Sequence, residues 1–208
     1  MEKIITILFL TIFLIGCKAG VVVELPETEG EFGGGEIMAD VLLIIAQKDF
    51  QPVEYGDTRA ELEKAGLGIA VASITTDVAV GADSNTVKPD VAVKDANAAD
   101  YKAVVVIGGP GAHTLGEHEE VLELLKDAKD KGKVVAAICI APTILAKAGL
   151  LEGKKATVWN GDGEQAGVIE AGGAEFVDNP VVADGKIITG NGPAAAREFG
   201  KTIADALK

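Results

Sequence analysis

The stretch that most constrains the fold is Lys133–Gly153, in which a buried strand passes almost directly into a helix. Its first part, Val134–Ile138, is a continuous apolar run of the kind found in the middle of a parallel sheet. A helix is predicted over Pro142–Ala148, so only three residues separate the two elements. A turn this short is typical of a nucleophile elbow, which places Cys139 at a helix N-terminus, where backbone N–H groups and the helix dipole favour a thiolate. A buried cysteine acting as a small hydrophobe is the alternative interpretation.

Strand and helix patterns alternate along the rest of the chain. Strands are predicted at Asp40–Ala46, Gly68–Ser73, Tyr101–Ile107, Lys155–Trp159 and in a hairpin made of Val181–Ala183 and Lys186–Thr189. Helices are predicted at Pro52–Ala65, Glu119–Lys131, Gly163–Ala171 and Ala194–Leu207, and short strands that leave the main sheet at Ile74–Asp95. This order predicts an α/β fold, a three-layer sandwich of the flavodoxin-like type with a mostly parallel central sheet.

The N-terminus has the features of a lipoprotein signal peptide. Residues 1–16 combine Lys3 with an apolar stretch, Ile4–Ile15, that is too short to span a bilayer. It ends in Leu14-Ile15-Gly16-Cys17, similar to a bacterial lipobox in which Cys17 takes the lipid. Residues 17–36 are acidic and Gly-rich and predict a flexible tether, and residues 37–208 form the folded domain. We therefore expect an extracytoplasmic protein held at the membrane by a lipid on Cys17, or a cytoplasmic one if the true start codon lies further along.

Charge and cysteine content limit the partners. The formal net charge is −13, which argues against nucleic acid and anionic lipid surfaces as ligands. Cys17 and Cys139 are the two cysteines of the chain, so a lipid on Cys17 leaves Cys139 as a lone thiol without a disulfide partner. We expect a small-molecule substrate, no metal ion and no cofactor.

Three loops are expected to converge on Cys139, because ligands of open parallel sheets bind at the carboxyl ends of the strands. The loop after the first strand contains Glu54, a carboxylate that could orient the thiol or accept its proton. An exposed carboxylate at a helix start is the alternative for Glu54. The loop after Tyr101–Ile107 begins with Gly108 and Gly109, and the N–H groups of Gly109 and Ile140 could bind an oxyanion.

These motifs resemble the ThiJ/PfpI superfamily, whose members have a class I glutamine amidotransferase-like domain. The resemblance covers Asp40–Leu207 and rests on five elements in the same order: Glu54 twelve residues before Gly66, Gly108-Gly109, Ala137–Cys139 with Ala141-Pro142, Ala148-Gly149-Leu150, and Thr189 with Gly192-Pro193. It implies that Cys139 is the reactive cysteine, that Glu54 is the acidic residue hydrogen-bonded to it, and that Gly108, Gly109 and Ile140 form an anion pocket. It also implies a homodimer.

The chain departs from the superfamily at two positions. Protease-like members have His directly after the cysteine, whereas this chain has Ile140, which cannot move a proton. Deglycase-type members have another His near the cysteine, and that position corresponds to Trp159, which we expect to line the pocket together with Pro193. The two histidines, His113 and His118, are both interpreted as surface or helix-start residues, although His113 lies on the correct edge of the sheet.

The resemblance and these departures favour an enzyme in which Cys139 and Glu54 act on small reactive carbonyls, with glyoxalase- or deglycase-like chemistry in stress protection. The first alternative is a non-enzymatic lipoprotein that senses oxidation at Cys139 or uses its pocket for binding. The second is a cysteine peptidase, which Ile140 disfavours.

Overall fold

The computed structural model describes residues 39–208. The predicted signal peptide at residues 1–16, the tether at 17–36 and the lipidation site Cys17 lie outside the described residues, so they stay predictions. Within residues 39–208, no helix is both long and apolar enough to cross a membrane.

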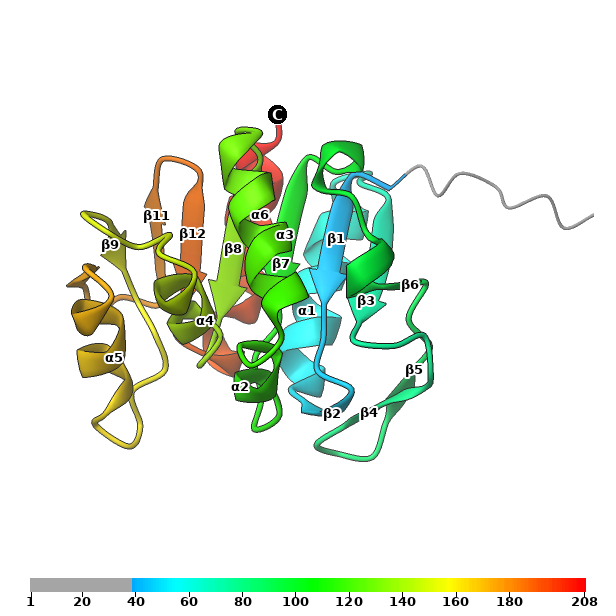
Figure 1. The fold of residues 1–208 in the computed structure, drawn as a ribbon, viewed down its shortest axis with the longest axis horizontal. Helices are drawn as coiled ribbons and strands as arrows, with labels where there is room; N and C mark the ends of the chain where they lie inside the picture. Colours follow the sequence, from blue (N-terminus) through cyan, green and yellow to red (C-terminus); the bar gives the residue numbers. More distant parts are fainter. Residues whose placement is uncertain (1–38) are drawn as a thin grey trace, which may run out of the picture. The chain divides into compact units, whose positions relative to one another are not determined.

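A seven-stranded sheet forms the centre of the domain, in the order β11-β12-β8-β7-β1-β3-β6 (Figure 1). All neighbouring strands are parallel except β11 and β12, which form an antiparallel hairpin at one edge. The strands are β1 (Val41–Ile44), β3 (Ile69–Ser73), β6 (Val91–Ala92), β7 (Ala103–Val106), β8 (Val134–Ile138), β11 (Val181–Asp184) and β12 (Ile187–Gly190). The predicted mostly parallel sheet is confirmed.

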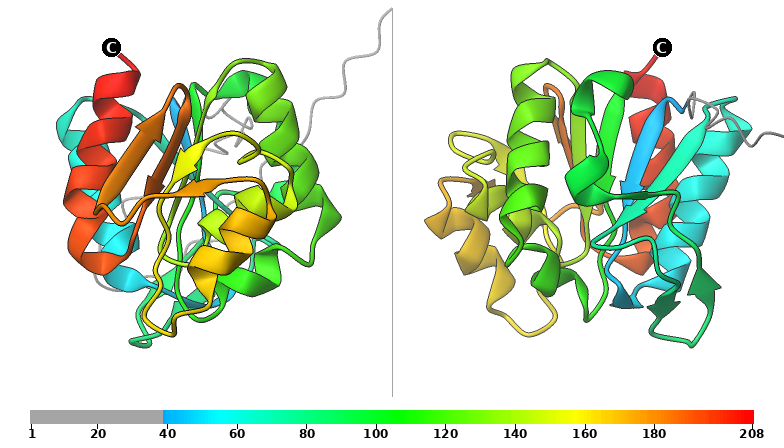
Figure 2. Two further views of the ribbon diagram at one scale, coloured as in Figure 1. Left: turned by 90° about the vertical axis from the view of Figure 1, so that its left-hand side faces the viewer. Right: turned by 45° about the vertical axis from the view of Figure 1, so that its right-hand side comes forward.

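Helices cover both faces of this sheet, which gives the predicted three layers. Figure 1 shows one pair of helices behind the sheet and a second group in front of it, and in the left view of Figure 2 the same two groups lie on opposite sides of the sheet. The first pair is α1 (Pro52–Lys64) and α6 (Ala196–Ala206). The second group is α2 (Ala112–Leu115), α3 (Glu119–Asp130) and α4 (Pro142–Lys147), with α5 (Gln165–Ala171) packed against α4. Short 3₁₀ helices are η1 (Val93–Asp95), η2 (Ala98–Asp100) and η3 (Pro193–Ala195).

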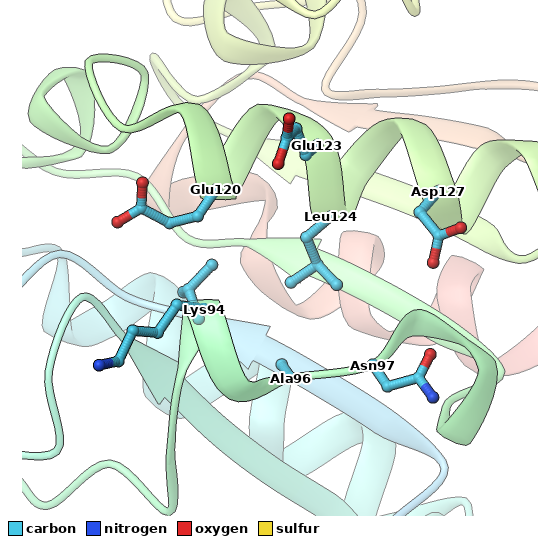
Figure 3. A pocket seen from close by; sticks show the side chains of 8 residues that line it. Lys94, Ala96, Asn97, Glu120, Glu123, Leu124 and Asp127 are labelled. Atoms are coloured by element: carbon cyan, nitrogen blue, oxygen red, sulfur yellow. The ribbon is translucent and has the colours of Figure 1, made fainter.

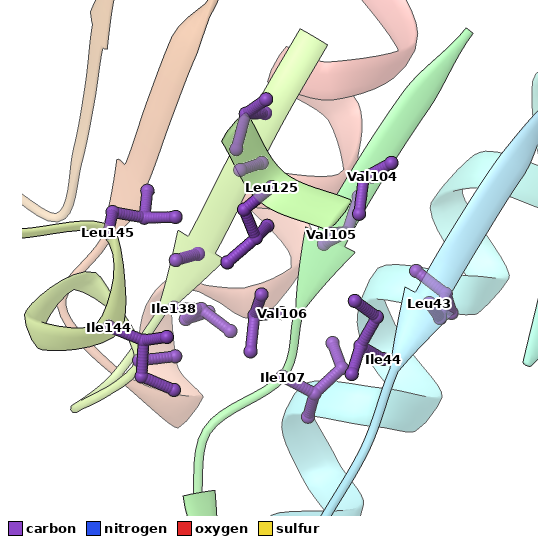
Figure 4. Close-up of a cluster of buried hydrophobic side chains, with 14 of the residues drawn as sticks. Leu43, Ile44, Val104, Val105, Val106, Ile107, Leu125, Ile138, Ile144 and Leu145 are labelled. Atoms are coloured by element: carbon purple, nitrogen blue, oxygen red, sulfur yellow. The ribbon is translucent and has the colours of Figure 1, made fainter. Parts of the chain in front are cut away.

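The core lies between the sheet and its helices. In α3, the buried residues Val121, Leu124, Leu125 and Ala128 recur at helical spacing and form one apolar face. The central strands are buried on both sides, as expected for parallel strands covered by two helix layers. Each fully buried Val, Leu or Ile side chain stabilises such a core by about 1.5–3 kcal/mol. Figure 4 labels part of this core: Leu43, Ile44, Val104, Val105, Val106, Ile107, Leu125, Ile138, Ile144 and Leu145.

The strand predicted at Lys155–Trp159 is shorter than expected and lies outside the main sheet. It is reduced to β9 (Lys155–Ala156), which pairs with β10 (Glu175–Phe176). Beyond it the chain bonds to other elements: the Thr157 N–H donates to the Thr189 hydroxyl at 2.9 Å. The Trp159 N–H donates to the Cys139 carbonyl at 2.8 Å. These bonds draw the segment toward the turn after β8 instead of along a strand.

Two further predictions are refined by the structure. The excursion at Ile74–Asp95 is confirmed in part, because β4 (Ala79–Gly81) and β5 (Thr86–Val87) join β2 (Lys48–Phe50) in a separate small sheet, while β6 returns to the main one.

In the β11–β12 hairpin, Asp184 pairs with Ile187. The turn is therefore Gly185 and Lys186, one residue later than predicted, and Gly185 has the positive φ, 65°, that this turn needs.

Candidate active site

Cys139 occupies a strained turn directly after β8. Its φ is 65°, in the left-handed region that residues with a side chain rarely adopt. Two backbone hydrogen bonds hold it there: its N–H donates to the Gly190 carbonyl at 2.9 Å, and its carbonyl accepts from the Trp159 N–H at 2.8 Å. Strain of this kind costs about 1–3 kcal/mol and persists only where the surroundings fix it. The turn has the geometry of the predicted nucleophile elbow, and its side chain is 8% exposed.

Glu54 lies in the first turn of α1 and is completely buried. Its Oε2 accepts a hydrogen bond from the Gly108 N–H at 3.0 Å. Its Oε1 has no N–H or O–H partner among the described residues, and the carboxyl contacts the Cys139 thiol. A buried carboxyl with an unused oxygen beside a thiol is a costly arrangement, which favours a chemical role over an exposed helix-start carboxylate.

Gly108 is the point at which the two side chains meet. A Cβ on Gly108 would lie 2.4 Å from the Cys139 Cβ and 2.7 Å from the Glu54 Oε2, so only glycine fits. Because its N–H is already bonded to Glu54, Gly108 positions the carboxyl and is not free to bind an anion. The expectation that Gly108 belongs to the anion pocket is therefore corrected, whereas the N–H groups of Gly109 and Ile140 do lie against the Cys139 sulfur.

The loops after β1 and β7 are joined by two backbone hydrogen bonds. The Gln51 N–H donates to the Gly108 carbonyl at 2.9 Å, and the Gly111 N–H donates to the Asp49 carbonyl at 3.1 Å. Gly109 packs so closely on this loop that a Cβ there would lie 2.4 Å from the Gln51 nitrogen. Neighbouring strands β1, β7 and β8 thus bring the start of α1 against the elbow, as the position of ligands in open parallel sheets predicts.

A cavity of about 470 Å³ opens above Cys139. The predicted residues Gly109, Ile140, Trp159 and Pro193 line it together with the cysteine. Four further lining residues were not predicted from the sequence: Gln51, Pro110, Asp162 and Gln165. His113, which the sequence predicts at the surface, lines the cavity as well. The side chain of Gln51 caps α1 by accepting from the Val53 N–H, a signal that could have been read from its place before Pro52.

Comparison with known proteins places this architecture and site in one family. Residues 39–206 match the sequence model of the DJ-1/PfpI family. The chain belongs to the DJ-1/PfpI family. This confirms the resemblance seen in the sequence.

Relatives within the DJ-1/PfpI family include enzymes. The chain is 29% identical over 167 residues to the glutathione-independent glyoxalase DJR-1.2 of Caenorhabditis elegans, covering 80% of this chain and 88% of that one. It is 31% identical over 166 residues to the deglycase PfpI of Pyrococcus furiosus, covering 78% and 98%. The crystal structure of a ThiJ/PfpI domain protein from Brachyspira murdochii superposes with a TM-score of 0.77 at 28% identity, covering 81% of this chain and 95% of that one.

In this DJ-1/PfpI protein the carboxyl and the thiol form a coupled pair. Burial raises the pKa of Glu54 from its usual 4.5 to about 7, against the opposing effects of the Cys139 contact and the Gly108 N–H. Burial and the charge of Glu54 raise the pKa of Cys139 to about 12, although the N–H groups of Gly109 and Ile140 lower it. The pair therefore releases one proton near neutral pH and holds the second far into the alkaline range.

The expectation that a helix N-terminus favours the Cys139 thiolate is corrected by this pair. Helix α4 has only six residues, and the dipole of so short a helix is weak against burial beside a carboxylate. The thiol becomes easier to ionise only while Glu54 is protonated. The proton shared by the two groups, rather than the helix, controls the nucleophile.

A second hollow, of about 320 Å³, lies between α3 and the segment that contains η1, and it shares no lining residue with the Cys139 cavity. Figure 3 shows Leu124 pointing from α3 toward Ala96, with Glu120 and Asp127 at the ends of the groove. No cysteine lines it. Among residues 39–208, no three His, Cys, Asp or Glu side chains cluster in a way that could hold a metal ion.

Proposed function

We propose that this protein is a cysteine-dependent enzyme that acts on small reactive carbonyl compounds, with glyoxalase- or deglycase-like chemistry. One observation carries the proposal: Cys139 lines a cavity of about 470 Å³ that is large enough for a small molecule, and its thiol contacts the buried carboxyl of Glu54. The glyoxalase and deglycase among the relatives support the reaction class.

The first step is attack of the Cys139 sulfur on the aldehyde carbon of an α-oxoaldehyde such as methylglyoxal. A C–S bond forms, the C=O π bond breaks, and the thiol proton passes to Glu54. This transfer is accessible at neutral pH, since burial raises the pKa of Glu54 to about 7. The N–H groups of Gly109 and Ile140, which contact the sulfur, are placed to stabilise the oxyanion that develops beside it.

Completion of the reaction needs no external oxidant. Within the hemithioacetal, the aldehyde carbon is oxidised while the neighbouring ketone carbon is reduced, with a proton moved from one carbon to the other. Water then hydrolyses the thioester, which releases a 2-hydroxy acid and returns the proton to the thiol. Ile140 cannot act as the base of a peptidase, so the site favours carbonyl chemistry over peptide hydrolysis.

The test is methylglyoxal consumption and lactate formation by the purified full-length protein, with Cys139→Ala as the matched variant. We expect turnover by the wild type and none by the variant. Absence of wild-type turnover, combined with ready gain of two oxygen atoms at Cys139 under mild peroxide, would instead favour a redox sensor. Peptidase activity that depends on Cys139 would overturn the proposal.

We further propose that the enzyme acts in stress protection as a homodimer, anchored outside the cytoplasm by a lipid on Cys17. The lipobox-like sequence before Cys17 supports the anchor. Metabolic labelling with a fatty acid should mark the wild type and not Cys17→Ala. Sedimentation of the purified protein should give twice the mass of one mature chain, and a monomer would contradict the dimer.

A further inference from the structure

We propose that Trp159 determines substrate size, by closing the Cys139 cavity so that only short carbonyl compounds reach the sulfur. The inference deepens the proposed function, on which it rests for the nature of the substrate. It concerns the position that holds a histidine in deglycase-type relatives by resemblance, where this chain has its one tryptophan.

Trp159 separates two cavities. On one side it lines the space of about 470 Å³ above Cys139. On the other it lines a space of about 280 Å³ together with Asn160, Phe176, Asp178 and Asn191. No other residue lines both spaces. The indole is thus the wall between them, and its removal would join the second space to the first.

The wall is held in place by its neighbours. A Cβ on Gly161 would lie 2.4 Å from the Trp159 Cζ2, and a Cβ on Gly192 would lie 3.4 Å from its Cδ1. The ring therefore occupies space that the absence of a side chain at Gly161 leaves free, and Gly192 lies in ordinary contact with its other edge. The backbone N–H of Trp159 donates to the backbone carbonyl of Cys139 at 2.8 Å, so the residue that forms the wall is tied directly to the residue that carries the nucleophile.

This placement determines which substrates fit. Trp159 is 38% exposed and lines the cavity, so part of its apolar surface is accessible to a molecule that enters there. A rigid apolar wall accepts a methyl substituent beside the reacting carbonyl. It excludes a bulky substituent, which would need the space beyond the ring.

The experiment measures reaction of Cys139 with two maleimides that share the reactive ring and carry a small or a large substituent, N-methylmaleimide and N-(1-pyrenyl)maleimide, by peptide mass spectrometry of the full-length protein. Both reagents react with the same thiolate, so the ratio of the two rate constants does not depend on the ionised fraction of the thiol. The measurement also requires no enzymatic turnover. In Trp159→Ala, we expect the ratio of large to small reagent to rise about tenfold, the range that steric exclusion from a pocket produces. Val168→Ala, an exposed apolar residue of α5 outside both cavities, should leave the ratio unchanged.

Trp159→Phe provides the second measurement, because it keeps an aromatic side chain but shortens the wall. A raised ratio in either variant supports the proposal, and a ratio equal to that of the wild type in every folded variant overturns it. If Trp159→Ala fails to fold, the Phe variant decides alone.

The proposed function can fail separately. A changed maleimide ratio without methylglyoxal turnover would support the role of Trp159 as a wall and contradict the proposed enzymatic activity. In the active enzyme, the preference for methylglyoxal over phenylglyoxal should weaken in Trp159→Ala in the same proportion.

Discussion

The carboxyl of Glu54 and the thiol of Cys139 meet in the space where Gly108 has no side chain. A Cβ at that position would lie within 2.7 Å of both residues. Three separate stretches of the chain, the start of α1, the end of β7 and the end of β8, are needed to build this contact. The pair is buried beneath the cavity rather than displayed on a surface, and this burial sets the protonation of both groups.

Replacement of Cys139 by Ala should abolish methylglyoxal turnover, because no other thiol lies in the described residues. The thermal midpoint should stay within a few degrees of the wild type, since Ala occupies the same turn and removes only one small buried atom. Cys17→Ala is the matched control and should keep full turnover of the purified protein. Residual turnover in Cys139→Ala would show that the sulfur is not the nucleophile.

Glu54→Gln should separate thiol reactivity from turnover. The charge of Glu54 helps to raise the pKa of Cys139, so a neutral amide of the same shape should lower it and speed alkylation at pH 8. Turnover should fall about 100-fold, because the amide cannot take up the thiol proton. Glu63→Gln, on the exposed side of the same helix, should change neither quantity. Slower alkylation together with unchanged turnover would contradict the role of Glu54.

Stability should fall as pH rises through the range in which Glu54 ionises. The folded protein holds this proton up to about pH 7, whereas the unfolded chain releases it near the usual value of 4.5. The native state therefore binds more protons than the unfolded state between these values, and the free energy of unfolding decreases across the window by something on the order of 3 kcal/mol. Denaturant titrations of wild type and Glu54→Gln at pH 4.5 and 7.5 measure the difference. A pH dependence identical in both proteins would mean that Glu54 does not titrate there.

Gly108→Ala should destabilise the protein by about 3 kcal/mol, because the new methyl group overlaps both members of the pair. The control is Gly167→Ala, at an exposed helical position of α5 with nothing within 4 Å of its Cβ. That substitution should stabilise the protein by about 0.5–1 kcal/mol through helix propensity. Urea denaturation measures both effects. Equal stabilities of the two variants would show that the close approach at Gly108 is not present in solution.

The central sheet could be predicted because its strands are continuous apolar runs, which parallel strands buried on both faces require. The same reasoning failed for Lys155–Trp159, where the apolar pattern continues but the backbone bonds to Thr189 and Cys139. A local pattern contains no information about such distant partners. The small sheet of β2, β4 and β5 could be expected only as an excursion, since its strands are two or three residues long.

The site shows the same division between local and distant information. Cys139 could be identified from its strand–turn–helix context, and Glu54 from its resemblance to a family pattern. The protonation of the pair could not be predicted, because it depends on burial and on a contact between residues that are distant in the chain. The sequence predicts a surface position for His113, and the residue is exposed. It also lines the Cys139 cavity, which only the path of the loop after β7 reveals.

The hydrogen bond from the Cys139 N–H to the Gly190 carbonyl makes the strained turn depend on a strand that follows it in the chain. Gly190 ends β12, which leaves the ribosome about fifty residues after Cys139. The turn at Cys139 lacks this hydrogen bond until β12 has been made and has joined the sheet beside β8. A nascent chain that stops before β12 therefore lacks one of the two backbone bonds that hold the strained turn, and the geometry of the pair is completed only when β12 is in place.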